Sequence, residues 1–228
     1  MRHGATRRFA GMGVSAAMWA AVVLAPTDLA REGRPFDPDE DAAAPAPPVP
    51  EPYLELEARL AEGAPAIEPE LRQQLAAAIV VEAQAAQLDP LLILAVIEVE
   101  SRFDEVATSG AGALGLMQLR EPTLRRELER QGLSGDPFDP VVNVQAGVRY
   151  LRRLLDAFPR EDLALMAYNA GPNRILAFLR EGQIPERFHR YPRRVKAALR
   201  RLHEREPTAA ARILAEQRAA PAPLPSRG

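Results

Sequence analysis

Two glutamates stand at the end of an apolar segment in the middle of the chain, just before a glycine-bearing loop. Residues 91–97 are all apolar, Glu98 and Glu100 follow them, and a Gly/Ala/Ser loop at 109–115 leads to Gln118. Apolar surroundings disfavour the charged form of a carboxyl group and raise its pKa. A glutamic acid that stays protonated near neutral pH is able to donate a proton to a bound substrate. The pattern therefore predicts acid chemistry here.

Only one of the two glutamates is expected to carry that chemistry. Asp89 followed by Pro90 predicts a helix that begins at Pro90 and is capped by Asp89. Residues two apart on a helix point about 200° away from each other, so Glu98 and Glu100 face different sides. The apolar run is too short for a membrane span, so it predicts a helix buried inside a domain. For Glu98 we expect a partly exposed or salt-bridged side chain.

The acid-bearing helix is the first of three ordered sequence blocks. This first block covers residues 95–103, a Gly-Leu-Met-Gln block follows the glycine loop at 115–118, and Ala-Tyr-Asn-Ala-Gly-Pro occupies 167–172. In order and spacing the blocks resemble the catalytic core of the soluble lytic transglycosylase family. The resemblance covers roughly residues 70 to 196 and implies an all-α, goose-lysozyme-like fold.

The resemblance implies one catalytic residue, Glu100, and a groove that holds sugar. The groove residues that it implies are Ser101, Met117, Gln118, Tyr168, Asn169 and Tyr191. Among them Gln118 and Asn169 would hold N-acetyl and hydroxyl groups, and Tyr168 would donate a hydrogen bond to Glu100 or to the sugar. No metal or organic cofactor is implied.

Some positions depart from the family pattern or have a purely structural interpretation. Pro192 stands beside Tyr191 where the family usually has an aliphatic residue, so the match to the family pattern at Tyr191 is imperfect. Arg120-Glu121 stands where the family commonly has Met-Pro. A buried helical glutamate is usually a structural acid, Met117 fits a core position, Tyr168 fits a core tyrosine, and Asn169 fits a helix end. The three blocks together favour the site interpretation.

The reaction implied by the resemblance is cleavage of the β-1,4 bond between N-acetylmuramic acid and N-acetylglucosamine in peptidoglycan. The sugar's own 6-hydroxyl attacks the anomeric carbon and closes a 1,6-anhydro ring, with a single glutamate as acid and then base. One alternative is a hydrolytic muramidase, which would need a second carboxylate. Another is a non-catalytic glycan-binding protein of envelope assembly.

Composition excludes several classes of site. The 228 residues carry a formal charge of -2 and no cysteine, so we expect no nucleic-acid partner, disulfide or cysteine-linked lipid. The histidines His3, His189 and His203 show no metal-ligand spacing. The segment 187–205 is strongly basic; such segments usually form solvated helix faces, and a minority bind anions.

The ends of the chain predict export. Residues 1–30 combine arginines with an alanine-rich apolar stretch, as in a signal peptide or signal anchor, and 31–52 form a Pro/Ala-rich linker expected to be disordered. The lysozyme-like domain is expected over 53–205, with its core at 70–196, and a C-terminal helix and frayed tail over 206–228. We expect a periplasmic or envelope location, membrane contact only through an uncleaved N-terminus, and envelope or secretion-system proteins as further partners.

Helical periodicity and breakers predict the elements that position the site, and no β-strand pattern is found. The helix 69–87 and the acid-bearing helix that begins at Pro90 are expected to form a hairpin that turns at Leu88-Asp89. The other expected helices cover 53–61, 122–131, a segment from Pro140 through Leu155, 163–169, 173–180 and one after Pro207.

Overall fold

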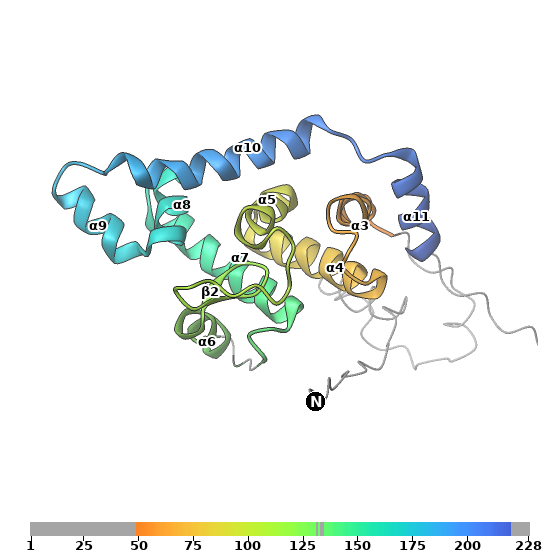
Figure 1. The fold of residues 1–228 in the computed structure, drawn as a ribbon, viewed down its shortest axis with the longest axis horizontal. Helices are drawn as coiled ribbons and strands as arrows, with labels where there is room; N and C mark the ends of the chain where they lie inside the picture. The colour runs from red at the N-terminus through yellow and green to blue at the C-terminus, as the bar shows by residue number, and fades with distance from the viewer. Residues whose placement is uncertain (1–48, 131, 133–134, 220–228) are drawn as a thin grey trace, which may run out of the picture.

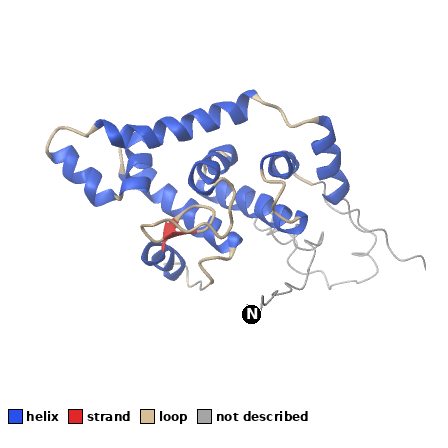
Figure 2. Cartoon of the chain, in the orientation of Figure 1, coloured by secondary structure: helices blue, strands red, loops and turns tan. Residues whose placement is uncertain are grey.

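The computed structural model describes residues 49–130, 132 and 135–219, and these are mostly helical (Figure 1, Figure 2). The helices are α3 (Glu51–Gly63), α4 (Pro69–Ala86), α5 (Pro90–Ser101), α6 (Glu121–Glu129), α7 (Pro140–Ala157), α8 (Glu161–Ala170), α9 (Pro172–Arg180), the 3-10 helix η1 (Glu186–His189), α10 (Arg190–Glu204) and α11 (Ala209–Ala219). This confirms the all-α class. The predicted export segment 1–30, most of the linker 31–52 and the tail 220–228 lie outside the described residues.

Prolines and aspartates set the helix starts as predicted. Asp89 caps α5 by accepting a hydrogen bond of 2.8 Å from the backbone N–H of Leu91. Asp139 caps α7 in the same way, accepting from Val141 at 2.9 Å. Helix α3 begins two residues earlier than predicted, because Pro52 lies in its first turn, where the missing N–H costs no hydrogen bond.

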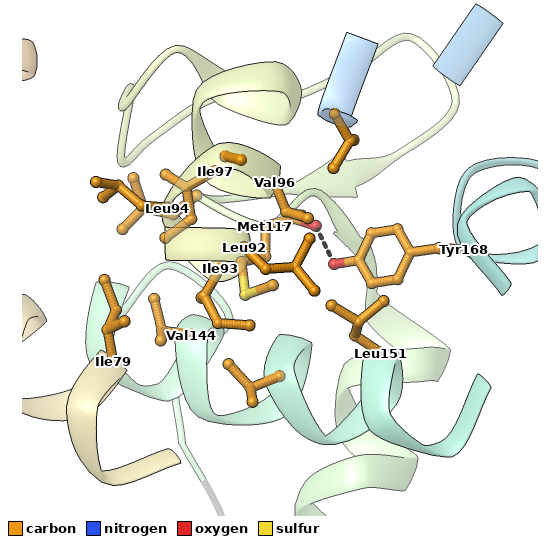
Figure 3. Close-up of a cluster of buried hydrophobic side chains, with 14 of the residues drawn as sticks. Ile79, Leu92, Ile93, Leu94, Val96, Ile97, Met117, Val144, Leu151 and Tyr168 are labelled. Atoms are coloured by element: carbon orange, nitrogen blue, oxygen red, sulfur yellow. Dashed lines mark hydrogen bonds between the residues drawn. The ribbon is translucent and has the colours of Figure 1, made fainter. Parts of the chain in front are cut away.

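Helix α5 is the centre of the core, which confirms the burial predicted for it. All of residues 91–97 are buried, with exposed fractions between 0% and 8%. Ile79 of α4 and Val144 and Leu151 of α7 surround Ile93 in Figure 3. An apolar helix packed on every side leaves its polar residues only at its C-terminal end, which is where Glu98 and Glu100 lie.

Helices α4 and α5 pack on each other and turn at Leu88-Asp89, as predicted, and they meet at an open corner. Gln87 ends α4 in the left-handed conformation (φ 53°), its N–H bonded back to carbonyls of that helix. The two axes then bend by 120° across the short break. Within the described residues, no single helix has both the length and the hydropathy of a membrane span; only this bent pair does so together.

A pair of two-residue strands interrupts the helical fold. Strands β1 (Ala113–Leu114) and β2 (Leu119–Arg120) pair antiparallel within the glycine loop, although no strand was predicted there. Strands of two residues are too short to show a period-2 pattern.

The C-terminal helices close the fold. Helix α10 crosses over α8 and α5 in Figure 1, and α11, which follows the C-terminal end of α10, packs on α3.

Candidate active site

Glu100 lies one residue before the end of α5, half-buried, and meets a tyrosine from a distant part of the chain. The hydroxyl of Tyr191, at the start of α10, donates a hydrogen bond of 2.6 Å to Oε1 of Glu100. Burial raises the pKa of Glu100 to about 7, although the Tyr191 hydrogen bond and the charge of Arg194 both act to lower it. A carboxyl with this pKa is partly protonated at neutral pH and exchanges its proton readily.

Glu98 lies on a different side of α5 and is salt-bridged, as the helix geometry predicted. Its Oε1 lies 2.6 Å from Nη2 of Arg201 on α10. It also lines a cavity of about 630 Å³ between α3, α5 and α10, together with Val99 and Arg194. Glu100 does not line that cavity. The two glutamates therefore lie in separate environments.

The Gly-Leu-Met-Gln block is fixed by an asparagine that sequence reasoning missed. Asn143 of α7 is fully buried; its Oδ1 accepts from the Met117 N–H at 2.8 Å and its Nδ2 donates to the Leu114 carbonyl at 3.0 Å. A Cβ on Gly115, where φ is +72°, would lie 2.6 Å from that Nδ2. The one available signal was a polar amide beside the apolar stripe of the predicted helix.

Tyr168 anchors the same block and does not donate to Glu100, contrary to one of the two roles expected for it. Its hydroxyl donates to the Met117 carbonyl at 2.8 Å, as drawn in Figure 3. Its ring stacks on that of Tyr191, with centroids 6.4 Å apart and planes inclined by 12°. The Tyr168 hydroxyl is therefore engaged by a backbone carbonyl, and the phenol that donates to Glu100 is that of Tyr191.

The remaining predicted groove residues are distributed over the loop, the core and the surface. Nε2 of Gln118 donates to the carbonyls of Ala107 at 3.1 Å and Gly115 at 3.0 Å, so its amide oxygen is left for other partners. Asn169 is exposed near the end of α8. Contacts of both residues with a substrate remain predictions.

Two other predicted residues are turned inward. Ser101 donates its hydroxyl to the Ile97 carbonyl of its own helix at 3.1 Å. The Met117 side chain is fully buried, and a Cβ on Gly147 would lie 2.3 Å from its sulfur. In this structure Met117 belongs to the core, and substrate contact by Ser101 remains a prediction.

The basic segment 187–205 is partly neutralised by acids of other helices. Lys196 lies 2.5 Å from Asp162, and His203 lies 2.8 Å from Asp89. The Lys196 partnership lowers the pKa of Asp162 and raises that of Lys196. Arg194 donates to the Val99 carbonyl at 3.1 Å, which holds its charge close to Glu100. Much of this segment therefore ties α10 to the domain.

Comparison with known proteins identifies relatives of this region. The family described as "Transglycosylase SLT domain" matches residues 77–188. The transglycosylase of Enterobacteria phage PRD1 is 38% identical over 86 residues, which cover 38% of this chain and 31% of that protein. The membrane-bound lytic murein transglycosylase C of Photorhabdus laumondii is 36% identical over 103 residues, covering 39% of this chain and 29% of that protein.

Solved structures show the same fold. The lytic transglycosylase Slt of Pseudomonas aeruginosa, an inactive glutamate-to-glutamine mutant, is 26% identical with a TM-score of 0.52, covering 66% of this chain and 30% of that one. The 70 kDa soluble lytic transglycosylase of Escherichia coli is 21% identical with a TM-score of 0.51, covering 68% and 32%. The predicted lysozyme-like transglycosylase fold is confirmed. The matched part spans about a third of the length of these proteins.

Proposed function

Residues 77–188 form a transglycosylase domain of the SLT family, and we propose that the protein is a peptidoglycan lytic transglycosylase whose single catalytic group is Glu100. The proposed reaction breaks the β-1,4 bond between N-acetylmuramic acid and N-acetylglucosamine and leaves a 1,6-anhydromuramic acid end. The observation that carries this proposal is the Glu100 carboxyl, with a pKa of about 7 and a phenol 2.6 Å away.

In the first step, protonated Glu100 donates its proton to the glycosidic oxygen as the bond to the anomeric carbon breaks. The 6-hydroxyl of the same muramic acid residue then attacks that carbon and closes the anhydro ring. Its proton passes to the Glu100 carboxylate, which restores the acid. A well-oriented internal hydroxyl can reach an effective molarity of about 10⁵ M or more, so the reaction needs no second carboxylate.

The neighbours of Glu100 support both of its protonation states. Burial favours the acid before proton transfer, while the Tyr191 hydroxyl and the Arg194 charge stabilise the carboxylate that forms afterwards. In this proposal the amide oxygen of Gln118 and the exposed amide of Asn169 hold the N-acetyl and hydroxyl groups of the glycan. Ser101 and Tyr191 complete the site.

We also propose an exported protein that acts in the cell envelope. The relatives named membrane-bound lytic murein transglycosylase C support an envelope location. Residues 1–30 would be the export signal or anchor, and 31–52 would link it to the catalytic domain at 53–205. In the cell envelope, envelope or secretion-system proteins would be further partners.

Digestion of purified peptidoglycan sacculi, followed by mass spectrometry, tests the reaction. We expect glycan ends that are lighter by one water than the reducing ends left by a hydrolase. Glu100→Gln should lower the rate by about 10²- to 10⁴-fold, the usual contribution of a general acid. Glu98→Gln, which loses only the ion pair with Arg201, is the matched control and should stay active.

Other results would assign a different function. Reducing ends would identify a muramidase. Undiminished lysis by the Glu100→Gln variant would remove Glu100 from the reaction. A folded wild-type protein that binds sacculi without cutting them would be a glycan-binding protein.

A further inference from the structure

A cavity lined by arginines lies between α4, α6 and α7, away from Glu100. Its volume is about 630 Å³. The charged residues that line it are Glu82, Glu127, Arg130, Arg149, Arg152 and Arg153. Neither the proposed reaction nor the predicted groove uses any of them.

Two buried carboxylates hold two of these arginines in fixed orientations. Nε and Nη2 of Arg149 donate to the two oxygens of Glu82, each at 2.8 Å. Arg153 lies one turn later on α7 and donates through the same two nitrogens, Nε and Nη2, to Glu127, with Nε at 2.9 Å from Oε2. Side-on pairing of this kind consumes Nε and Nη2 and leaves the Nη1 end of each guanidinium for another acceptor. The guanidinium group of Arg153 also lies over the ring of Tyr150, with 5.4 Å between Cζ and the ring centroid.

One of the donors left over lacks an acceptor within the described residues. Nη1 of Arg149 is buried and has no hydrogen-bond partner there. A buried donor without an acceptor costs about 1–3 kcal/mol, so such groups usually meet a ligand or water. Arg130 forms no ion pair with any described residue, and Arg152 pairs with Asp156. Four arginines and two carboxylates line this cavity, and Asp156 lies outside it, so positive charge exceeds negative charge there even when Asp156 is counted.

We propose that this cavity is an oxyanion site that binds a phosphate group. Arg149 and Arg152 line the cavity from α7 and Arg130 lines it from the end of α6, so arginines of two helices surround the same space. A tetrahedral phosphate presents acceptor oxygens in several directions, and arginine is the side chain that best matches it. In this arrangement Glu82 and Glu127 act as positioning residues, because they align the guanidinium groups without touching the anion.

Isothermal titration of the full chain with inorganic phosphate tests the site, at constant ionic strength against a sodium chloride blank. We expect saturable binding of one phosphate. Arg149→Lys keeps a cation beside Glu82 but removes the free Nη1, and should weaken phosphate binding by at least about 10-fold, the effect of one charged hydrogen bond. Arg125→Met is the matched control, because Arg125 lies on α6, is exposed and pairs with Glu121 outside the cavity.

Further arms make the result decisive and separate the sources of phosphate. A thermal melt shows whether the Arg149→Lys variant folds. If it does not fold, Arg130→Met at the exposed end of α6 is the test variant, and it should weaken phosphate binding. Sedimentation with phosphatidylglycerol vesicles, against neutral phosphatidylcholine vesicles, separates a lipid headgroup from free phosphate: loss of vesicle binding in the same variants assigns the headgroup. Absence of saturable binding by the wild type, or equal affinity in the variants and the Arg125→Met control, overturns the proposal.

Discussion

At the scale of single residues, opposing effects set the acidity of Glu100. Burial is the largest and raises the pKa, while the Tyr191 hydroxyl and the Arg194 charge lower it, and the result is about 7. The net value is useful because an acid whose pKa equals the working pH is both available and easily recharged. Each contribution can be removed separately.

Tyr191→Phe removes the hydrogen bond that stabilises the carboxylate. We expect the pKa of Glu100 to rise, so the alkaline limb of the pH–rate profile should move to higher pH. The rate should fall by about 10- to 100-fold, because the acid also loses its orienting partner. Tyr168→Phe is the control: its hydroxyl bonds the Met117 carbonyl, so the alkaline limb should stay in place. A profile shifted by Tyr168→Phe and not by Tyr191→Phe would contradict the assignment.

Glu100 should also make stability depend on pH. Its pKa is about 7 in the folded chain and near the ordinary 4.5 in the unfolded one. Between these values the unfolded chain has lost the proton that the folded chain keeps, so this residue lowers stability as pH rises through that window, by up to about 3 kcal/mol. Glu100→Gln should therefore gain stability over wild type at pH 8 but not at pH 4, measured by urea unfolding. An equal difference at both pH values would argue against the raised pKa.

At the scale of elements, the helices were predictable wherever a local signal fixed them. Asp89-Pro90 placed the start of α5, Pro140 placed that of α7, and the uniformly apolar run placed α5 in the core. The corner between α4 and α5 was not predictable, because it depends on packing between helices distant in sequence. Tyr168 was expected to donate to Glu100 or to the sugar, whereas Tyr191 is the donor to Glu100. Sequence spacing does not tell which of two tyrosines reaches a carboxyl group.

The loop that follows α5 depends on a contact that only tertiary structure reveals. Asn143→Ala would leave the Met117 N–H without its acceptor and the Leu114 carbonyl without its donor, inside the protein. We expect a loss of about 2–3 kcal/mol in the free energy of unfolding and a higher KM, because the loop also carries Gln118. Asn173→Ala, at an exposed position of α9, should change neither quantity. An unchanged unfolding curve for Asn143→Ala would show that the loop is held by other contacts.

At the scale of the whole molecule, α10 connects elements that are far apart in sequence. Its first turn reaches Glu100 through Tyr191, and its later turns reach Glu98 through Arg201 and Asp89 through His203. Surface ion pairs contribute little individually, about 0–1 kcal/mol each. Their importance lies in fixing the position of Tyr191 relative to α5, which makes the acid's environment a property of the assembled domain.

Helix α11 closes the molecule at the opposite end, and its docking can be tested without touching the site. Ala211 and Ala215 form its inward face and meet Ala58 of α3 in a tightly buried contact. Ala215→Asp would bury a charge there, and we expect a loss of about 1–3 kcal/mol, visible as a lower Tm and faster hydrogen exchange in α3. Ala210→Asp, one turn away on the exposed face, should stay within about 0.5 kcal/mol of wild type. Both variants should cleave sacculi at the wild-type rate at low temperature, because α11 packs on α3 rather than being part of the proposed site. Loss of activity in Ala215→Asp while it remains folded would show that α11 acts on the site through α3.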